Sequence, residues 1–475
     1  MMKFPAKKTL FLWGILCFVT AGSVGSGFAA GKAILKKASR FEKNGWIYIH
    51  IEGTPQERGY QHGYLLSNEI RDAIQTLSYY VNKQYKVSWD FFRQAAKEVY
   101  WPKVPAEYRE EIKAIARGVR DHGIKNIDYV DIAALNGWIE TAWYYLPWYK
   151  QKKENKKLPK KDLPKGSCSA FIATGNATKD GRIVMAHNSW FDYMVSRFWN
   201  VMMDLQPDTG HRILMQTYPG FIHSGTDWYI SSAGILATET TITQFHGYNP
   251  QGIPEFVRVR KATQYANSLD DWIQTMLDGN SGGYANDWLI GDTKTGEIAR
   301  LELGLKNYKV WRTFNGYFVG CNIALDKNVR KETSFDYGSP VTSPYNRYSR
   351  WQQLMKQYYG EIDVPLAKAF MADHFDVSRN RYQPSARTLC GHIELDPAGS
   401  PEWEVGPHYP SGAVDAKATD SALATQMKTW GFWGHSCGMD FRAEDFLKQH
   451  PEYNWQKPFL KDIPAYSWTL FGAAW

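Results

Sequence analysis

The fold is decided at residues 165–173, where the sequence reads KGSCSAFIA. A lysine-rich run ends here and an apolar, strand-like run begins, with Cys168 at the junction. A second apolar run follows at 182–187, and the Asp-Gly pair at 180–181 is a turn signal. We therefore predict a β-hairpin with strands at 169–174 and 182–187.

This hairpin would bring three reactive groups to one end of a sheet. Cys168 opens the first strand, and His187, Asn188 and Asp192 lie at the end of the second or just beyond it. A thiol next to an imidazole and a carboxylate has the parts of an activated nucleophile. The hairpin therefore indicates cysteine-based catalysis.

Length and composition allow a large, well-packed fold. The chain has 475 residues, of which 44% are hydrophobic and 15% aromatic. That length suits one large domain or two ordinary ones. The aromatic side chains can fill the core, or some of them can line an apolar ligand pocket.

The first 29 residues are typical of a secretory signal peptide. Lysines at positions 3, 7 and 8 precede an apolar run from Leu10 to Thr20, and small residues near Ala29 suit a cleavage site. The run is too short for an ordinary spanning helix, and no later segment is apolar for long enough to span a bilayer. We expect a periplasmic or secreted protein with no integral membrane segment in the mature chain.

The charge of the chain does not indicate a nucleic-acid partner. The formal charge is +8, and removal of the three lysines of residues 1–29 leaves +5. Much of the remaining excess lies in the lysine- and proline-rich stretch 151–167, which we interpret as a solvated linker. No nucleic-acid recognition motif accompanies it.

The cysteines allow at most one internal disulfide beside a nucleophile. Cys17 leaves with the signal, and Cys168 would be reactive, so that Cys321, Cys390 and Cys437 remain. The sequence does not choose a pair among them. Zinc-type spacings such as CxxC are absent, so we expect no metal and no other cofactor, and we interpret the histidines at 374 and 435 as structural.

The order of the elements predicts an α+β fold. After a strand near 45–53, residues 30–150 are mainly helical, and the linker 151–167 leads into a strand-rich region at 168–475. Two sheets covered by helices would suit this pattern. Further along, residues 256–277 are predicted to form one long helix.

A papain-type protease is the first alternative. The segment around Cys168 superficially resembles the Gly-Ser-Cys-Trp-Ala-Phe of that family. That family places its histidine about 130–150 residues after the cysteine, but residues 298–318 contain no histidine. In addition, the residues after Cys168 look like a strand, whereas the papain cysteine opens a helix.

A better match is to the N-terminal-nucleophile hydrolases. Four segments carry the resemblance, in matching order: GTPQERGYQHGY at 53–64, GSCSA at 166–170, HNSWFDY at 187–193 and SSAGILATETT at 231–241. They resemble segments of the autoproteolytic family typified by acyl-CoA:6-aminopenicillanic acid acyltransferase, and more closely those of the phospholipase B-like proteins. The resemblance covers nearly all of the mature chain.

The resemblance implies a four-layer αββα sandwich and a chain that cuts itself between Ser167 and Cys168. The light and heavy chains would remain associated. Cleavage would give Cys168 a free α-amine, whose reference pKa near ~7.7 lets it take the thiol proton without a distant histidine. Cys168 would form a thioester with an acyl group, which water or, in an acyltransferase, an amine would release.

The resemblance also assigns roles to three further residues. Asn322 matches the strand-end asparagine that the wider superfamily uses in its oxyanion hole. Arg347 matches an arginine near the nucleophile, with Arg350, one helical turn on, as the competing candidate. Asp192 would orient either the α-amine or His187.

The remaining assignments concern the branch of the family and the substrate. His187 stands where bile-salt hydrolases carry Arg and penicillin acyltransferases carry Gln, which favours the phospholipase B-like branch. Ser231 occupies a position where the bile-salt enzymes have an oxyanion-hole Asn. Ser231, Thr240 and Asn188 are the predicted substrate-binding residues.

The sequence thus predicts an exported cysteine hydrolase that cleaves a linear amide bond of an N-acylated small molecule. Phospholipase B-like deacylation of a lipid is an alternative within the same class. A non-catalytic lipid- or metabolite-binding protein on the same fold is an alternative from a different class.

Overall fold

A computed structural model describes residues 31, 33–153 and 168–472. The predicted signal peptide, Ser167 and most of the predicted linker lie outside these residues. The predicted boundary at Cys168 therefore stays a prediction.

Within the described residues, nine strands form one sheet. Their spatial order is β1-β2-β5-β6-β7-β8-β9-β10-β11, and every neighbouring pair is antiparallel except the parallel pair of β2 and β5. The strands are β1 (Ser39–Lys43), β2 (Trp46–Gly53), β5 (Val201–Pro207), β6 (Ile213–Thr217), β7 (Trp228–Ser231), β8 (Ile235–Thr241), β9 (Asn286–Asp292), β10 (Glu297–Leu303) and β11 (Tyr308–Thr313).

A second sheet of seven strands, counted over the same residues, holds the predicted hairpin. Its order is β12-β3-β4-β16-β17-β18, with β15 pairing β4 beyond the end of β16. The strands are β3 (Cys168–Gly175), β4 (Gly181–Asp192), β12 (Gly316–Gly320), β15 (Ser411–Ala413), β16 (Asp415–Asp420), β17 (Lys428–Trp433) and β18 (Thr469–Gly472). A short separate pair joins β13 (Phe375–Asp376) and β14 (Arg381–Tyr382).

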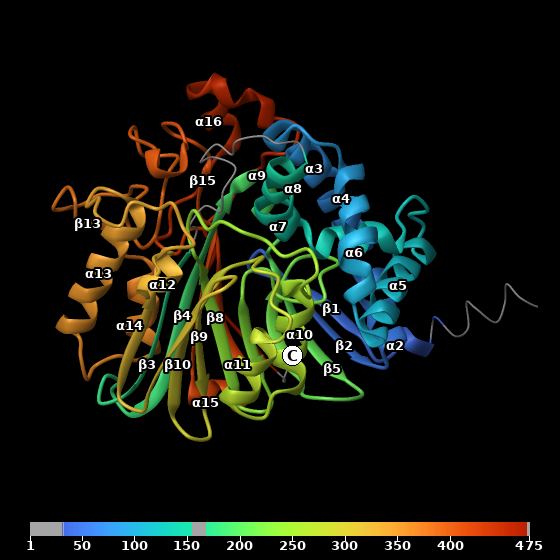
Figure 1. Ribbon diagram of the computed structural model, residues 1–475, viewed down its shortest axis with the longest axis horizontal. Coiled ribbons are helices and arrows are strands. Elements are labelled where there is room, and N and C mark those ends of the chain that lie inside the picture. Colours follow the sequence, from blue (N-terminus) through green and yellow to red (C-terminus); the bar gives the residue numbers. More distant parts are fainter. Residues whose placement is uncertain (1–30, 32, 154–167, 473–475) are drawn as a thin grey trace, which may run out of the picture.

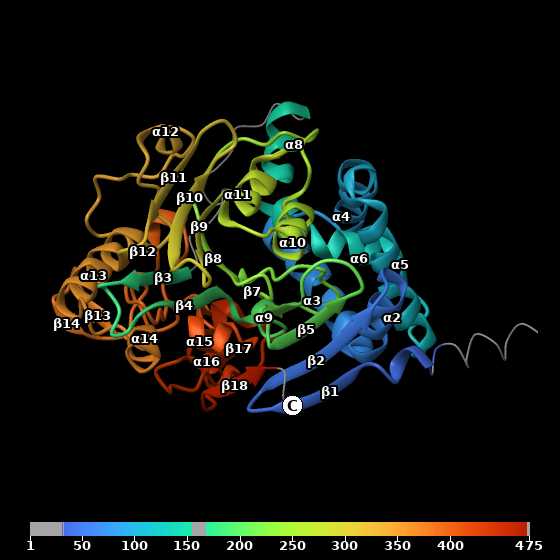
Figure 2. The same cartoon turned by 90° about the horizontal axis from the view of Figure 1, so that it is seen from below.

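Helices cover the outer faces of both sheets (Figures 1 and 2). Against the first sheet pack α10 (Glu255–Tyr265) and α11 (Leu269–Leu277), and against the second pack α13 (Ser343–Gln357) and α14 (Val364–Met371). The four layers therefore follow the order α, β, β, α, which confirms the predicted α+β class.

The N-terminal helices gather at the side of the molecule that carries β1 and β2 (Figure 1). They are α2 (Pro55–Leu65), α3 (Ser67–Tyr85), α4 (Trp89–Ala95), η1 (Ala96–Tyr100), η2 (Trp101–Lys103), α5 (Ala106–Asp121), α6 (Tyr129–Asn136), α7 (Trp138–Glu140), η3 (Thr141–Tyr145) and α8 (Leu146–Lys153). The shorter helices of the later chain are α9 (Tyr193–Ser196), α12 (Lys327–Arg330), η5 (Pro401–Trp403), α15 (Ser421–Ala424), α16 (Ala443–Gln449) and η6 (Pro451–Gln456).

The two sheets pack face to face where the β3–β4 hairpin lies. A Cβ atom added at Gly291 of β9 would lie 3.0 Å from Cδ1 of Ile172 and 3.1 Å from Cδ1 of Ile183. Side chains alternate between the two faces of a strand, so Cys168 and Ala170 share the face of Ile172. Cys168 therefore points into the space between the sheets.

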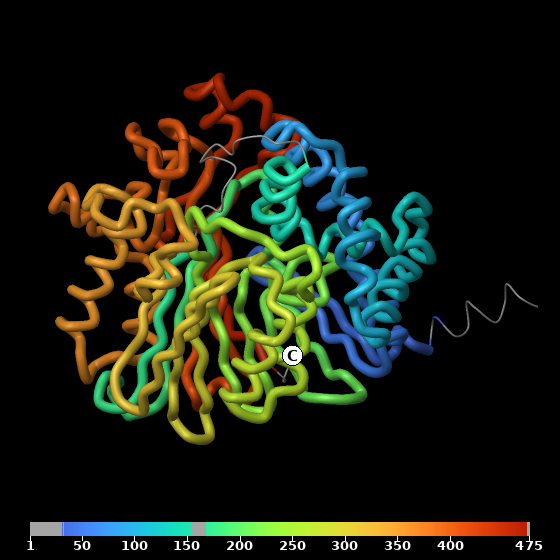
Figure 3. The backbone as a smooth tube through the Cα atoms, in the orientation of Figure 1, coloured from blue at the N-terminus to red at the C-terminus, as the bar shows by residue number. Residues whose placement is uncertain are grey.

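Segments that are far apart in sequence complete both sheets. The parallel pairing of β2 and β5 joins residues 47–53 to residues 201–207, and β16 lies beside β4 although about 230 residues separate them (Figure 3). The N-terminal region is therefore not a separate helical unit, because two of its strands extend the first sheet.

Two element predictions need comment. The helix predicted at 256–277 is two helices, α10 and α11. The break comes where the Ser268 side chain accepts a hydrogen bond from the Asp271 amide and caps the second helix. Strand β4 runs on to Asp192, five residues past its predicted end, because β15 and β16 pair with its second half.

Buried charges tie the N-terminal helices to the later chain. Arg58 of α2 donates through Nε to Glu111 of α5 (2.7 Å), and Nη2 of Arg260 of α10 lies 3.1 Å from the same carboxylate. All three side chains are almost fully excluded from solvent. A buried carboxylate between two guanidinium groups stabilises the fold only while all members are present.

We expect Glu111→Ala to lower the free energy of unfolding by about 3–5 kcal/mol, because it leaves the buried Arg260 without its carboxylate and Arg58 with only its pairs to Glu107 and Asp208. The matched control is Glu110→Ala on the same helix, whose side chain is 42% exposed and pairs with Lys113. That control should cost under about 1 kcal/mol. Urea unfolding measures both, and equal midpoints for the two variants would contradict the assignment.

Candidate active site

Cys168 begins β3 opposite Ser189 of β4 and is buried. Burial raises the pKa of its thiol well above the ordinary value, and the nearby Glu239 carboxyl acts in the same direction. A backbone hydrogen bond from Trp190 and the charge of Lys417 lower it. The thiol is therefore neutral in this environment and needs a base before it can attack a carbonyl.

The backbone of Cys168 is held by Asn322 and Arg347. The Cys168 amide donates to Oδ1 of Asn322 (3.1 Å), Nη2 of Arg347 donates to the same oxygen (2.9 Å), and Nη1 of Arg347 donates to the Cys168 carbonyl. Asn322 follows β12 and has a φ of +70°, in the left-handed region that asparagine tolerates better than most residues. Its Nδ2 donates to the carbonyl of Thr241 (2.8 Å).

A hydrogen bond and a ring contact also hold the Arg347 side chain in place. Its Nε donates to Ser343 Oγ one helical turn earlier on α13 (3.0 Å), and its guanidinium lies over the ring of Trp190 at 4.5 Å. Burial lowers the pKa of Arg347 to about 10, which still leaves it charged at neutral pH. Arg350, the competing candidate, instead forms a two-pronged ion pair with Asp373 (2.9 and 2.6 Å).

A buried ion pair lies on the β4 side of the thiol. Nζ of Lys417 is 2.7 Å from both Ser189 Oγ and Asp415 Oδ1, and both charged side chains are fully buried. Asp415 also accepts from the Ser189 amide (3.2 Å) and from Nε2 of Gln216 (2.8 Å). The ammonium group of Lys417 is therefore fixed next to the strand position that faces Cys168.

Two carboxyl groups face each other on the β8 side. Asp227 and Glu239 are both buried and act on each other's pKa, so the pair keeps a proton. Burial raises the pKa of Asp227 to about 7 and that of Glu239 well above its ordinary value. Tyr284 donates to Glu239 (3.2 Å), as does Asn286 (2.9 Å) in the amide orientation that satisfies both of its polar atoms.

His187 lies diagonally across from Cys168. It pairs with Ala170 in the register of β3 and β4, and diagonal neighbours on one face of a sheet are about 7–8 Å apart. Burial and the charge of Lys417 lower the pKa of the imidazole well below its ordinary value, so the ring is neutral. Among the described residues, neither Cys168 nor Asp192 is its hydrogen-bond partner.

Three predicted site residues are placed away from the thiol. Asp192, on the opposite face of β4 from His187, accepts hydrogen bonds from Tyr80 (2.5 Å) and Tyr409 (2.9 Å). Asn188, on that same outer face, donates to the carbonyls of residues 371 (2.8 Å) and 389 (3.1 Å). Ser231 lies at the far end of its strand pair, about 16 Å along β8 from Thr240.

Thr240 contacts Asn322 rather than Cys168 itself. Its Oγ accepts a hydrogen bond from the Asn322 amide (3.3 Å), and its side chain fills the space above Gly320, where an added Cβ would lie 2.7 Å from Cγ2. Thr240 therefore positions the turn that carries Asn322.

Comparison with models of known protein families gives a match to this chain. The family model described as Phospholipase B matches residues 43–306, which is more than half of the chain. The chain belongs to the phospholipase B family.

Individual relatives are distant. An uncharacterized protein of Archaeoglobus fulgidus is 30% identical over 307 residues, covering 60% of this chain and 48% of its own length. Phospholipase B of Crotalus adamanteus is 28% identical (64% and 54% covered), and phospholipase B-like 1 of Homo sapiens is 32% identical (57% and 52% covered). The chain spans about half the length of the curated relatives it matches.

Among solved structures, penicillin V acylase from Agrobacterium tumefaciens aligns with a TM-score of 0.33 and 10% identity, covering 56% of this chain and 83% of its own. In the part of the chain that the structure describes, no helix combines the length and apolarity needed to cross a bilayer.

Sequence reasoning missed the charged groups around Cys168. Asp415, Lys417 and Thr419 alternate with alanines along one strand, which indicates a polar face of β16 directed into the fold. That signal was available in the sequence. Asp227 and Glu239 lie 12 residues apart in a region of ordinary strands, and nothing local marks them as a proton-sharing pair.

The raised pKa of Asp227 has a consequence for stability. Between pH 4 and pH 7 the folded state keeps a proton that the unfolded state releases, so this group's contribution to the free energy of unfolding falls as pH rises through that window. Asp227→Asn mimics the protonated carboxyl and suits the local φ of +54°. Relative to wild type, the variant should gain stability from pH 4 to pH 8, by about 1.4 kcal/mol per unit of pKa shift at most.

Thermal unfolding of both proteins across this pH range measures the difference, with the exposed Asp278→Asn as control. A stability difference that stays constant with pH would contradict the shared-proton assignment.

Proposed function

We propose that this chain is a self-processing cysteine hydrolase that cleaves the amide bond of an N-acylated small molecule. The observation that carries the proposal is the hydrogen bond from the Cys168 nitrogen to Asn322, an acceptor that Arg347 holds in place. The buried amide of any strand residue needs an acceptor, but it does not need its orientation toward its own side chain to be fixed. A terminal α-amine that must act as a base does, because its orientation toward the thiol decides proton transfer.

Self-processing would begin at the bond before Cys168. The sulfur attacks the carbonyl carbon of Ser167, the peptide C–N bond breaks, and the nitrogen takes up a proton to become the α-amine of Cys168. Water then hydrolyses the resulting thioester, leaving a carboxylate on Ser167 and a free thiol. Arg347, bound to the Cys168 carbonyl, keeps the reacting residue in register during both steps.

Turnover would use the same sulfur on an external carbonyl. The α-amine takes the thiol proton, the thiolate attacks, and the tetrahedral oxyanion collapses to a thioester as the amine leaves. Asn322 and Arg347 orient the base, and the proton shared by Asp227 and Glu239 is available to the departing amine. Water then releases the acid and restores the thiol.

The choice of an amide rests on that proton. An amine is a poor leaving group unless it is protonated, and the site places a carboxyl pair that keeps a proton near neutral pH close enough to act electrostatically on the thiol. The family match favours a second candidate, deacylation of a phospholipid ester.

The two processed pieces would stay associated. The parallel pairing of β2 with β5 and the buried Arg58–Glu111–Arg260 contacts join residues on both sides of the cleavage point. Both interactions would survive a cut at residue 167.

Intact mass and N-terminal sequencing of the purified full chain test the processing step. We expect a heavy chain beginning at Cys168 in the wild type and a single uncut chain in Cys168→Ala. The matched control is Cys321→Ser, another buried cysteine, which should be cut as in the wild type. An uncut wild-type chain that nevertheless hydrolyses acyl substrates would contradict the role of the α-amine.

Substrate class is tested with the cut protein on matched N-acyl amides and lyso- and diacyl-phospholipids. Higher kcat/KM on amides supports the first candidate, and higher kcat/KM on phospholipids supports the second. Binding without turnover, unchanged in Cys168→Ala, would mean that the fold serves a non-catalytic binding protein.

Arg347→Lys tests whether the hydrogen bonds of Arg347 to Asn322 and the Cys168 carbonyl support turnover. Lysine keeps the charge but cannot contact the Cys168 carbonyl, Asn322 and Ser343 at once, because its ammonium lacks the planar fork of guanidinium. We expect kcat to fall about 10²–10³-fold in the cut protein with little change in KM. An unchanged kcat would show that the hydrogen bonds of Arg347 to Cys168 and Asn322 do not contribute to turnover.

A further inference from the structure

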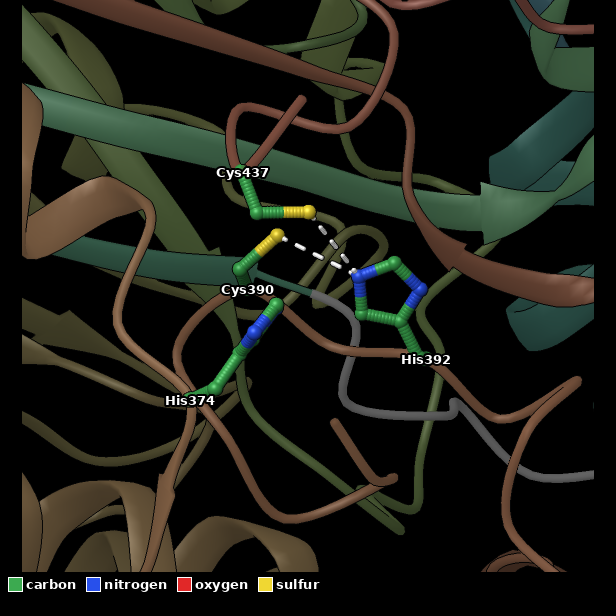
Figure 4. Close-up of side chains that lie close together, drawn as sticks. All are labelled: His374, Cys390, His392 and Cys437. Carbon is green, nitrogen blue, oxygen red and sulfur yellow. Dashed lines mark hydrogen bonds between the residues drawn. The ribbon is translucent and has the colours of Figure 1, made fainter. Parts of the chain in front are cut away.

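We propose that His374, Cys390, His392 and Cys437 form a structural zinc site. Their ligand atoms all lie within 4.8 Å of one another, although 63 positions separate the first from the last. The four side chains converge from three segments of the chain (Figure 4). None of them takes part in the chemistry at Cys168.

The distances suit tetrahedral coordination. Nε2 of His392 is 3.5 Å from the sulfur of Cys390 and 3.5 Å from that of Cys437. A tetrahedral zinc ion with Zn–S of 2.3 Å and Zn–N of 2.0–2.1 Å holds sulfur and nitrogen ligands about 3.5 Å apart. The longest separations in the set need to shorten by only about 1 Å for all four ligands to bind one ion.

The histidine at the centre already has the support that a metal ligand needs. Nδ1 of His392 lies 2.7 Å from Oε1 of Glu394, and the other oxygen of Glu394 accepts from Tyr193 (2.6 Å). This fixes the ring so that Nε2 faces the two sulfurs. A carboxylate bound to the far nitrogen of a ligating imidazole is the usual arrangement around zinc.

His374 supplies an independent sign of a missing partner. Its Nε2 is excluded from solvent and has no hydrogen-bond partner within the residues that the structure describes. A buried ring nitrogen without a partner is unfavourable unless something binds it. A metal ion shared with the two neighbouring sulfurs would satisfy it.

Two hydrogen bonds to backbone carbonyls hold the segments that carry these residues together, independently of any metal ion. The Cys390 amide donates to the carbonyl of Asp373 (3.1 Å), which puts Cys390 beside His374. Ser436 Oγ donates to the carbonyl of Met371 (2.6 Å), which ties the turn that carries Cys437 to the end of α14. His374 and Cys437 are only partly buried, so an ion can enter from solvent.

Two thiolates and two neutral imidazoles around Zn²⁺ give a site with no net charge, suited to a buried position. Any proton that the cysteine sulfurs or the ligating imidazole nitrogens hold is released to solvent on binding, and no oxidation occurs. Four protein ligands leave no open coordination position, so the role is structural rather than catalytic. The set is discontinuous in sequence, which is why a search for CxxC spacing misses it.

Metal content of the dialysed full chain tests the site. Inductively coupled plasma mass spectrometry should find about one zinc per chain in the wild type and in the control Cys321→Ser. His374→Ala and Cys437→Ser should lose it. Glu394→Gln should keep the ligands but weaken zinc binding about 10–100-fold, measured by competition with a chelating dye.

If the ligand variants fail to fold, a second measurement on the wild-type protein tests the same site. Wild-type protein stripped by chelator and loaded with Co²⁺ should absorb in the visible as tetrahedral cobalt–thiolate sites do, and zinc should displace that signal. A wild-type chain with no metal and a mass 2 Da low from a disulfide between Cys390 and Cys437 would overturn the proposal. Zinc retained by both ligand variants, or copper in its place, would also overturn it.

Discussion

Arg347 is the side chain on which the geometry around Cys168 depends. It lies beyond the reach of water, so each of its donors must meet an acceptor inside the protein. Those acceptors are the Cys168 carbonyl, the Asn322 amide oxygen and Ser343 Oγ. They come from β3, the turn after β12 and α13, so one guanidinium fixes a strand, a turn and a helix around the reactive residue. A surface arginine could not do this, because water would compete for every donor.

The buried charged groups near Cys168 are held in paired form. Lys417 and Asp415 neutralise each other, and Asp227 and Glu239 keep a proton between them. Unpaired, any of these groups would cost several kcal/mol to bury. The pairing leaves a cation near a thiol that burial keeps neutral, and a carboxyl pair close enough to raise the pKa of that thiol. A reaction that moves protons near neutral pH is consistent with this distribution of charge, and an ordinary apolar core is not.

The sequence allowed prediction of the backbone better than of the charges. Alternation and the Asp-Gly turn located the hairpin, and the family resemblance led to Asn322 and Arg347, both of which the structure brings to Cys168. The catalytic roles of these residues stay predictions. Asp192 and Asn188 follow His187 closely in sequence, but strand alternation and the extension of β4 turn them to the outer face. Their placement depends on strands β15 and β16, more than 200 residues away, which no local pattern contains.

Trp190 contacts both Arg347 and the segment that carries two of the proposed zinc ligands. One face of its ring receives Arg347, and its indole packs so closely on the 390–392 segment that an added Cβ at Gly391 would lie 2.0 Å from it. The proposed zinc ligands Cys390 and His392 flank that glycine. A metal that fixes this segment would therefore fix the wall against which Arg347 rests, and through Arg347 the backbone of Cys168. On this view the C-terminal loops, which contribute no group to the reaction, determine how rigidly the nucleophile is held.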